Sequence, residues 1–182
     1  YYVNVYDTAA TSSIQFAIAY GNSLGSGSAV YNSSVNGLSP TSTIYGQWQD
    51  LVIGDENTNF NFGGVTQSEF FVISMERARY KESIALGSMT LFLSGSISMS
   101  LTDNSSYVSS VIYNEAGRVY QLIQGSAGQL SAPAPGWSAT NGSFGWFLPD
   151  IGTILLSYIV FLLILKGSTQ LSLIPSFESK RH

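Results

Sequence analysis

The first residue that could do chemistry is Ser23, in the run GNSLG at residues 21–25. This run matches G-x-S-x-G, the pattern that holds a nucleophilic serine on a sharp turn between a strand and a helix. A serine nucleophile needs a histidine base, and the single histidine of the chain is His182, in the terminal run SFESKRH. The residues that follow the run, GSGSAVYNSS, do not predict a helix. We therefore interpret it as a flexible Gly/Ser loop.

Three acidic residues are the next candidates, because paired carboxylates can support acid–base or glycoside-hydrolysing chemistry. Asp50, Asp55 and Glu56 lie near the predicted end of a helix. Adjacent acids at such a position are usually solvated, so we do not expect them to be catalytic. With one His and no Cys, the chain also lacks a ligand set for structural zinc. We expect no enzymatic activity, no metal, no cofactor and no small-molecule substrate.

One dense charged segment, residues 76–82, lies within the run FFVISMERARYKES. Its charged residues are Glu76, Arg77, Arg79, Lys81 and Glu82. In an extended chain the three cations would share one face, with both glutamates opposite. The segment is either a solvated strand end, where exposed ion pairs contribute ~0–1 kcal/mol, or a docking element that fixes register against carboxylates of a neighbouring chain. Under the second interpretation, these five residues form a subunit interface.

The rest of the chain is almost uncharged, and this limits the classes of function. Only 10% of the residues are charged and the net charge is −4, whereas a typical soluble domain is roughly 25% charged. Nucleic-acid binding needs a broad basic patch, so we do not expect it. Little charge repulsion separates copies of such a chain, which favours self-association. The chain begins at Tyr1 without an initiator Met, so we expect a piece of something longer.

The predicted elements are mainly β-strands. Residues 1–8 and 12–23 alternate polar and apolar side chains, as half-buried strands do. One amphipathic helix is expected at about 40–53, after Ser39-Pro40, with Ile44, Trp48, Leu51 and Val52 on its apolar face. Further strand candidates lie around 59–62, 69–75, 88–94, 97–101, 107–113 and 117–124.

The fold class that follows is mainly β, an antiparallel sandwich or barrel with one or two short helices. Residues 1–124 are expected to form a β-rich domain with the helix inserted, and Gly117 to sit at a hairpin tip. A Gly/Ser/Pro-rich loop or linker is predicted at 125–143. Residues 144–182 are predicted as an apolar β/α segment that packs on the core or on a partner, beginning with two strands around a turn at 149–152.

The most apolar run, residues 151–165, raises the question of a membrane anchor. A spanning helix needs ~20 apolar residues, and a shorter run is more often a buried element. We therefore expect no membrane association, although a membrane-anchored surface protein stays an alternative.

Six stretches of the sequence, given below in chain order, resemble a family of virion structural proteins of contractile-tailed phages, especially those that infect marine cyanobacteria. The likeness covers roughly residues 20–175 and departs from the family at Leu86-Gly87, where Pro-Gly is more usual, and in the apolar run after Ser157. The stretches are GSGS, IYGQWQDLVIGDENTNFNFGG, FFVISMERARYKESIALGSMTLFLSG, SLTDNSS, GRVYQLIQGS and SFGWFLPDIGTILLS.

The resemblance implies a tail or baseplate component that works by assembly with other virion proteins and copies of itself. It further implies localisation to the virion, after assembly in the host cytoplasm. In such a particle the charged segment would supply register on an otherwise neutral surface. A different class stays open, a surface adhesin or receptor-binding module whose aromatic residues and Gly/Ser/Asn loops hold a glycan.

Overall fold

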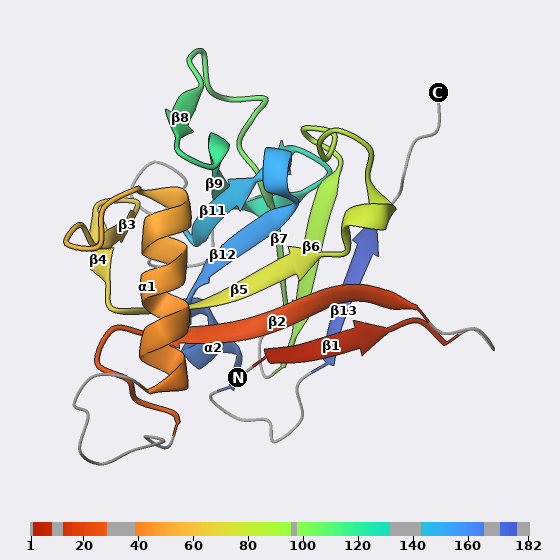
Figure 1. Ribbon diagram of the computed structural model, residues 1–182. Helices are drawn as coiled ribbons and strands as arrows, with labels where there is room; N and C mark the ends of the chain where they lie inside the picture. The colour runs from red at the N-terminus through yellow and green to blue at the C-terminus, as the bar shows by residue number, and fades with distance from the viewer. Residues whose placement is uncertain are drawn as a thin grey trace.

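The computed structural model describes residues 2–8, 13–28, 39–95, 98–131, 143–165 and 172–177. It is mostly antiparallel β-structure with two short helices, which confirms the predicted fold class (Figure 1). The helices are α1 (Pro40–Val52) and α2 (Tyr158–Leu165), and the 3₁₀ turns are η1 (Arg77–Arg79) and η2 (Pro149–Ile151). The strands are β1 (Tyr2–Tyr6), β2 (Ile14–Asn22), β3 (Phe60–Phe62), β4 (Val65–Gln67), β5 (Glu69–Met75), β6 (Met89–Ser94), β7 (Met99–Asp103), β8 (Ile112–Asn114), β9 (Gly117–Ser126), β10 (Gln129–Leu130), β11 (Gly145–Leu148), β12 (Thr153–Ser157) and β13 (Ser172–Phe177).

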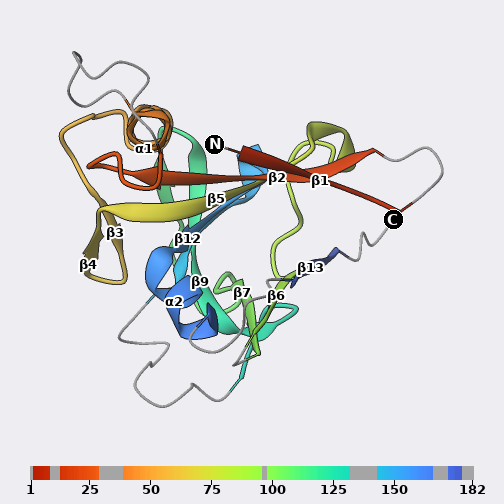
Figure 2. The ribbon, with the colours of Figure 1, turned by 90° about the horizontal axis from the view of Figure 1, so that it is seen from below.

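Most strands form one large sheet that curls into a half-barrel (Figure 2). Its order is β1-β2-β5-β12-β11-β9-β7-β6-β13, with β8 and β10 also paired to β9. Strands β3 and β4 form a separate hairpin. Because the main sheet is not closed, β1 and β13 are its two edges. The right-handed twist between neighbouring strands produces this kind of curl.

Helix α1 begins where the sequence predicts and packs against β2. Ser39 caps it, because its hydroxyl accepts the Ser42 N–H at 3.3 Å while the Ser42 hydroxyl accepts the Ser39 N–H at 3.1 Å. The helix lies close to the sheet at Gly21, where an added Cβ would come 3.2 Å from the backbone of Tyr45. A side chain at residue 21 would therefore push α1 away.

The buried face of α1 differs from the predicted one. Its buried residues are Thr41, Tyr45, Gln49 and Val52, whereas Leu51 is 48% exposed. Ile44 and Trp48 flank this stripe and are half-buried. Tyr45 and Gln49 can be buried because their polar tips reach carbonyls, Tyr45 that of Gln67 at 2.6 Å and Gln49 that of Thr58 at 2.9 Å. An apolar pattern could not reveal a face that carries these polar tips.

The sheet is packed on both faces, because its central strands carry apolar residues in both directions. On β5, Phe70 and Val72 join an outer cluster with α1 and β3, while Ile73 and Met75 join an inner cluster within the curl. The outer cluster contains Tyr45, Val52, Phe60, Phe62, Phe70, Val72, Ala116, Val119, Leu148 and Leu155. The inner cluster contains Phe16, Ile73, Met75, Met89, Leu91, Leu93, Met99, Leu101, Tyr120, Leu122, Phe144, Phe147, Ile154, Leu156 and Val160.

Strands β11 and β12 surround the predicted turn and lie in the middle of the sheet. Gly152 ends this turn with a left-handed φ of 59°, and β12 pairs with β5 on one side and β11 on the other. Gly117, the first residue of β9 after the turn from β8, likewise has a positive φ of 103°, as predicted. The sheet thus runs across the predicted domain boundaries, because residues 145–157 supply two central strands.

Three observed elements differ in their bounds from the predicted ones. The linker predicted from residue 125 starts inside the sheet, because β9 runs to Ser126 and β10 pairs back onto it; residues 132–142 lie outside the described part. The strand predicted at 107–113 is only β8, since a turn closed by the Tyr107 N–H and the Asn104 carbonyl precedes it. The strand predicted at 97–101 is observed at Met99–Asp103.

The apolar run at 151–165 divides between three elements, η2, β12 and α2. Strand β12 is buried along its whole length, and α2 is 8 residues long. Among the described residues, no helix is both long and apolar enough to cross a bilayer.

Candidate functional site

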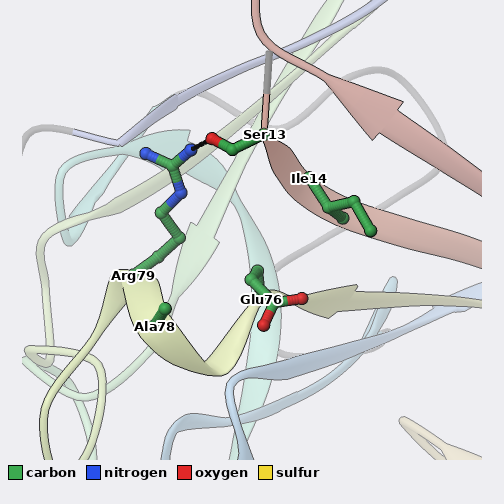
Figure 3. A pocket seen from close by; sticks show the side chains of 5 residues that line it. All are labelled: Ser13, Ile14, Glu76, Ala78 and Arg79. Atoms are coloured by element: carbon green, nitrogen blue, oxygen red, sulfur yellow. Dashed lines mark hydrogen bonds between the residues drawn. The ribbon is translucent and has the colours of Figure 1, made fainter. Parts of the chain in front are cut away.

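The charged segment lies at the end of β5, and all five of its charged residues are exposed. Figure 3 shows two of them, Glu76 and Arg79. The Glu76 N–H still donates to the Gln15 carbonyl of β2, at 3.0 Å. Beyond that point the backbone bonds to itself, with the Arg79 N–H donating to the Glu76 carbonyl at 2.9 Å. This closes η1, so the extended conformation expected for the segment is wrong. The expected common face for its three cations does not form.

Arg79 is engaged by its own chain. Its guanidinium lies 3.4 Å from the carboxylate of Asp7 and donates a hydrogen bond to the Ser13 hydroxyl (Figure 3). Gln15 holds the same carboxylate oxygen, with its Nε2 donating at 2.8 Å. These contacts tie η1 to the end of β1 and the start of β2. Arg79 therefore braces an edge of the sheet.

Arg77 folds back on the segment. Its guanidinium lies 4.5 Å from the centre of the Tyr80 ring and donates to the Tyr80 carbonyl at 2.8 Å. The Tyr80 ring in turn covers Gly152, where an added Cβ would come 2.5 Å from the ring. The segment is thus anchored at Arg77 and Tyr80 on the turn between β11 and β12.

The remaining charges of the segment are turned outward. Among the described residues, Glu76, Lys81 and Glu82 form no ion pair. Beside Glu76 is an open hollow of about 480 Å³, lined by Ser13, Ile14, Glu76, Ala78 and Arg79 (Figure 3). A site that encloses a small ligand buries most of its surface. This hollow is open to solvent and does not enclose a ligand in that way.

Sequence reasoning missed the residues that hold Arg79 in place. Asp7 is 72 positions away from Arg79 and Ser13 is 66 positions away. One signal could have pointed to Asp7, because it is the single charged residue among the first 50 except for Asp50. A lone charge on a neutral hairpin favours an ion pair with a distant segment.

A second polar cluster, also missed, lies on β2 and β5. The Tyr20 hydroxyl donates to the Glu69 carboxylate, which also accepts from the Asn22 amide at 3.0 Å. Burial, together with the hydrogen bond to Glu69, raises the pKa of Tyr20 to about 12. Tyr20 therefore stays a neutral donor at physiological pH. The cluster is internally satisfied, and it fixes β2 against β5 at the end where α1 packs.

The serine and the carboxylates weighed from sequence show no catalytic arrangement in the described residues. Ser23 lies in a turn where the Asn22 side chain accepts the N–H groups of Leu24 and Ser26, at 2.9 and 3.2 Å. His182 lies outside the described residues. Asp55 is exposed, and hydrogen bonds from Thr58 and Asn57 lower the pKa of its carboxyl.

Asp50 and Glu56 are also exposed, as expected for solvated acids. Within the described ranges, no three His, Cys, Asp or Glu side chains gather in a way that could hold a metal ion.

Comparisons of the chain with protein-family models, with curated proteins and with solved structures found no match.

Proposed function

We propose that the chain is a structural subunit of a contractile phage tail, most specifically of the baseplate, and that it acts by assembly and not by catalysis. The observation that carries the proposal is the ordered series of stretches over residues 20–175 that resembles virion structural proteins. Its partners are then other virion proteins and further copies of itself. Its location is the virion, after assembly in the host cytoplasm.

The surface chemistry supports assembly. Large apolar side chains such as Leu24, Ile112 and Tyr113 are 87, 60 and 70% exposed. A chain with 10% charged residues has little to keep such surfaces apart. Contacts of this kind give affinity without orientation, because apolar surface does not discriminate between registers.

The charged segment supplies the orientation that apolar contacts lack. Glu76 lines the open hollow, and the exposed Lys81 and Glu82 follow it along the segment, so that both signs of charge are present on this surface. A partner with complementary charges and one protruding side chain would bind here in preference to other proteins. The charges would also allow only one register between the two surfaces. The docking role proposed for the five charged residues therefore rests most on these three, with Arg77 and Arg79 holding the segment in shape.

The cations do not support nucleic-acid binding. Arg79 and Arg118 are paired with Asp7 and Asp150. Lys81 lies between Tyr80 and Glu82. Within the described residues this leaves no broad basic surface for a phosphate backbone.

The test is immunogold electron microscopy of purified phage particles that encode the chain, labelled with an antibody raised against it. We expect gold particles to label the end of the tail. In a separate experiment, the purified protein should bind no glycan on a glycan array. Label confined to material that separates from the particles would contradict the proposal. Saturable glycan binding would favour the adhesin alternative, and recovery of the chain only in detergent would favour the membrane anchor.

A further inference from the structure

Strand β1 lies at one edge of the sheet. Among the described strands it pairs with β2 alone, so the side of β1 that faces away from β2 offers its backbone N–H and C=O groups to a further strand. Natural edge strands are usually blunted by charges or by Pro. The strand YVNVY contains neither, and Val3 is 65% exposed on it. The stretch up to Val5, before the irregularity between Val5 and Tyr6, can therefore accept another strand.

The opposite edge of the sheet is blunted. Strand β13 contains Pro175, at the position that pairs with Leu91 of β6. Proline has no N–H group to donate, so it weakens an edge as a template for a further strand. A head-to-tail ring in which β1 of one copy extends β13 of the next is thus disfavoured. The better partner for β1 is a second β1.

The sequence of β1 is complementary to itself. YVNVY reads identically in both directions. In an antiparallel pair of β1 strands centred on Asn4, Val3 of each copy lies opposite Val5 of the other. Asn4 then lies opposite Asn4. Cross-strand pairs of like apolar residues stabilise such a seam by about 0.2–1 kcal/mol each.

We propose that β1 joins two copies of the chain into a symmetric dimer, with the twofold axis through Asn4. The two half-barrels then share one continuous sheet, and the exposed Val3 of each copy is covered by Val5 of the other. The irregularity between Val5 and Tyr6 ends the regular part of the edge. The seam is short, and the dimer is expected to dissociate readily on dilution. The inference goes beyond the virion assignment, because the purified chain alone tests it.

Cysteine cross-linking tests the register directly, because the chain contains no Cys. In the proposed dimer the two Asn4 Cα atoms are ~4.5–5.5 Å apart, within the ~4.4–6.8 Å that a disulfide spans. The control is Tyr6→Cys, at a residue that is 53% exposed. Its two copies would be four residues apart along the seam, ~14 Å.

We expect mild oxidation to convert Asn4→Cys into a covalent dimer about ten-fold faster than Tyr6→Cys, on non-reducing gels. Equal rates would indicate random collision and would overturn the proposal. Absence of any Asn4→Cys dimer would overturn it too, whether the chain is a monomer or pairs through another surface. Circular dichroism of both reduced variants confirms that they are folded.

A second measurement needs no cross-link. In sedimentation equilibrium, the mean mass of the unaltered chain should rise with concentration from 19.6 kDa toward twice that value. Val3→Lys should stay at the monomer mass, because each seam would bury two ammonium groups. Val65→Lys is the matched control, at a valine that is 47% exposed on β4; it should associate as the unaltered chain does. Identical behaviour of the two variants would contradict the β1 seam, as would an unaltered chain that stays monomeric.

Discussion

The ion pair between Arg118 and Asp150 joins β9 to the turn before β12. The Arg118 Nε lies 3.1 Å from both oxygens of the Asp150 carboxylate, and the Arg118 backbone N–H donates to the same group at 2.8 Å. The side-chain hydrogen bonds from Arg118 are the main cause that lowers the pKa of Asp150. Because the folded-state pKa is depressed, the stabilisation is present above the unfolded pKa of about 3.9 and is lost as the pH falls below it.

We therefore predict that Asp150→Asn lowers the free energy of unfolding at pH 7 by about 1–2 kcal/mol, a range discounted for partial exposure to solvent. The difference from the unaltered chain should shrink as the pH falls below about 4. Urea unfolding at several pH values measures this. A difference that stays constant down to pH 2 would contradict the assignment of the pair.

The Gly152 turn gives a second prediction at the scale of one residue. Gly152 has a left-handed φ of 59°, and an added Cβ would come 2.5 Å from the Tyr80 ring. Gly152→Ala should destabilise the chain by about 2–4 kcal/mol.

The control is Gly46→Ala in α1, because a Cβ there meets nothing within 4 Å. That substitution should stabilise by up to ~1 kcal/mol. Thermal unfolding of both variants tests the contrast, and equal effects would show that the turn is not constrained.

Single residues also show where sequence reasoning works. Gly117 and Gly152 were predictable as turn residues, because a short polar or Pro-Asp run between apolar strands demands a positive φ. The contact between Arg79 and Asp7 was not predictable, since it depends on which strands lie next to each other in the sheet. The residue types that form a turn can be read from the sequence. A contact between residues 72 positions apart, such as Arg79 and Asp7, depends on how the strands are arranged in the sheet.

At the scale of elements, η1 connects the edge hairpin β1–β2 to the body of the sheet through Arg79. Removing the guanidinium in Arg79→Gln should change global stability by at most ~1 kcal/mol, because the ion pair is exposed. Hydrogen exchange of the β1 amides should nevertheless quicken, because that end of the hairpin opens locally. Arg77→Gln is the control, because the Arg77 guanidinium bonds to Tyr80 of its own segment and not to Asp7 or Ser13 among the described residues. Equal protection of β1 in both variants would contradict the brace.

The outward charges of the segment give the prediction for assembly. Lys81→Gln removes the positive charge that the segment turns outward, and it should leave the isolated domain folded while reducing its incorporation into particles. The control makes the same change in net charge elsewhere, as Val65→Asp at an exposed position of β4. Incorporation is measured by immunoblotting purified particles. Normal incorporation of the Gln variant, or equal loss in both, would contradict a register role for the segment.

Helix α1 shows how an element can be predicted while its orientation is not. Its ends followed from Ser39-Pro40 and Gly54, which are local signals. Its buried face depended on Tyr45 and Gln49, whose polar groups find carbonyl partners only in the folded chain. A pattern of apolar residues ranks side chains by how favourable their transfer out of water is. It therefore cannot predict that a polar side chain will be buried because it finds a hydrogen-bond partner.

For the whole molecule, the mainly β class was predictable and the arrangement was not. Strand candidates such as 69–75 and 117–124 follow from alternation and turn residues. Strand β12 lies between β5 and β11 in the middle of the sheet. Its position could not be predicted, because residues 151–165, which contain β12, resemble a short membrane segment in the sequence. The candidate interface was predictable as a charge cluster. Its shape, a 3₁₀ turn beside an open hollow, required the fold.

The central claim is that the chain belongs to a particle as one of its parts. The most direct measurement is its copy number in gradient-purified phage particles, by quantitative mass spectrometry with isotope-labelled peptides. The account predicts a constant number of copies per particle across preparations, resistant to washing with high salt. A trace amount that varies between preparations or washes away, with the chain free in the lysate, would contradict it.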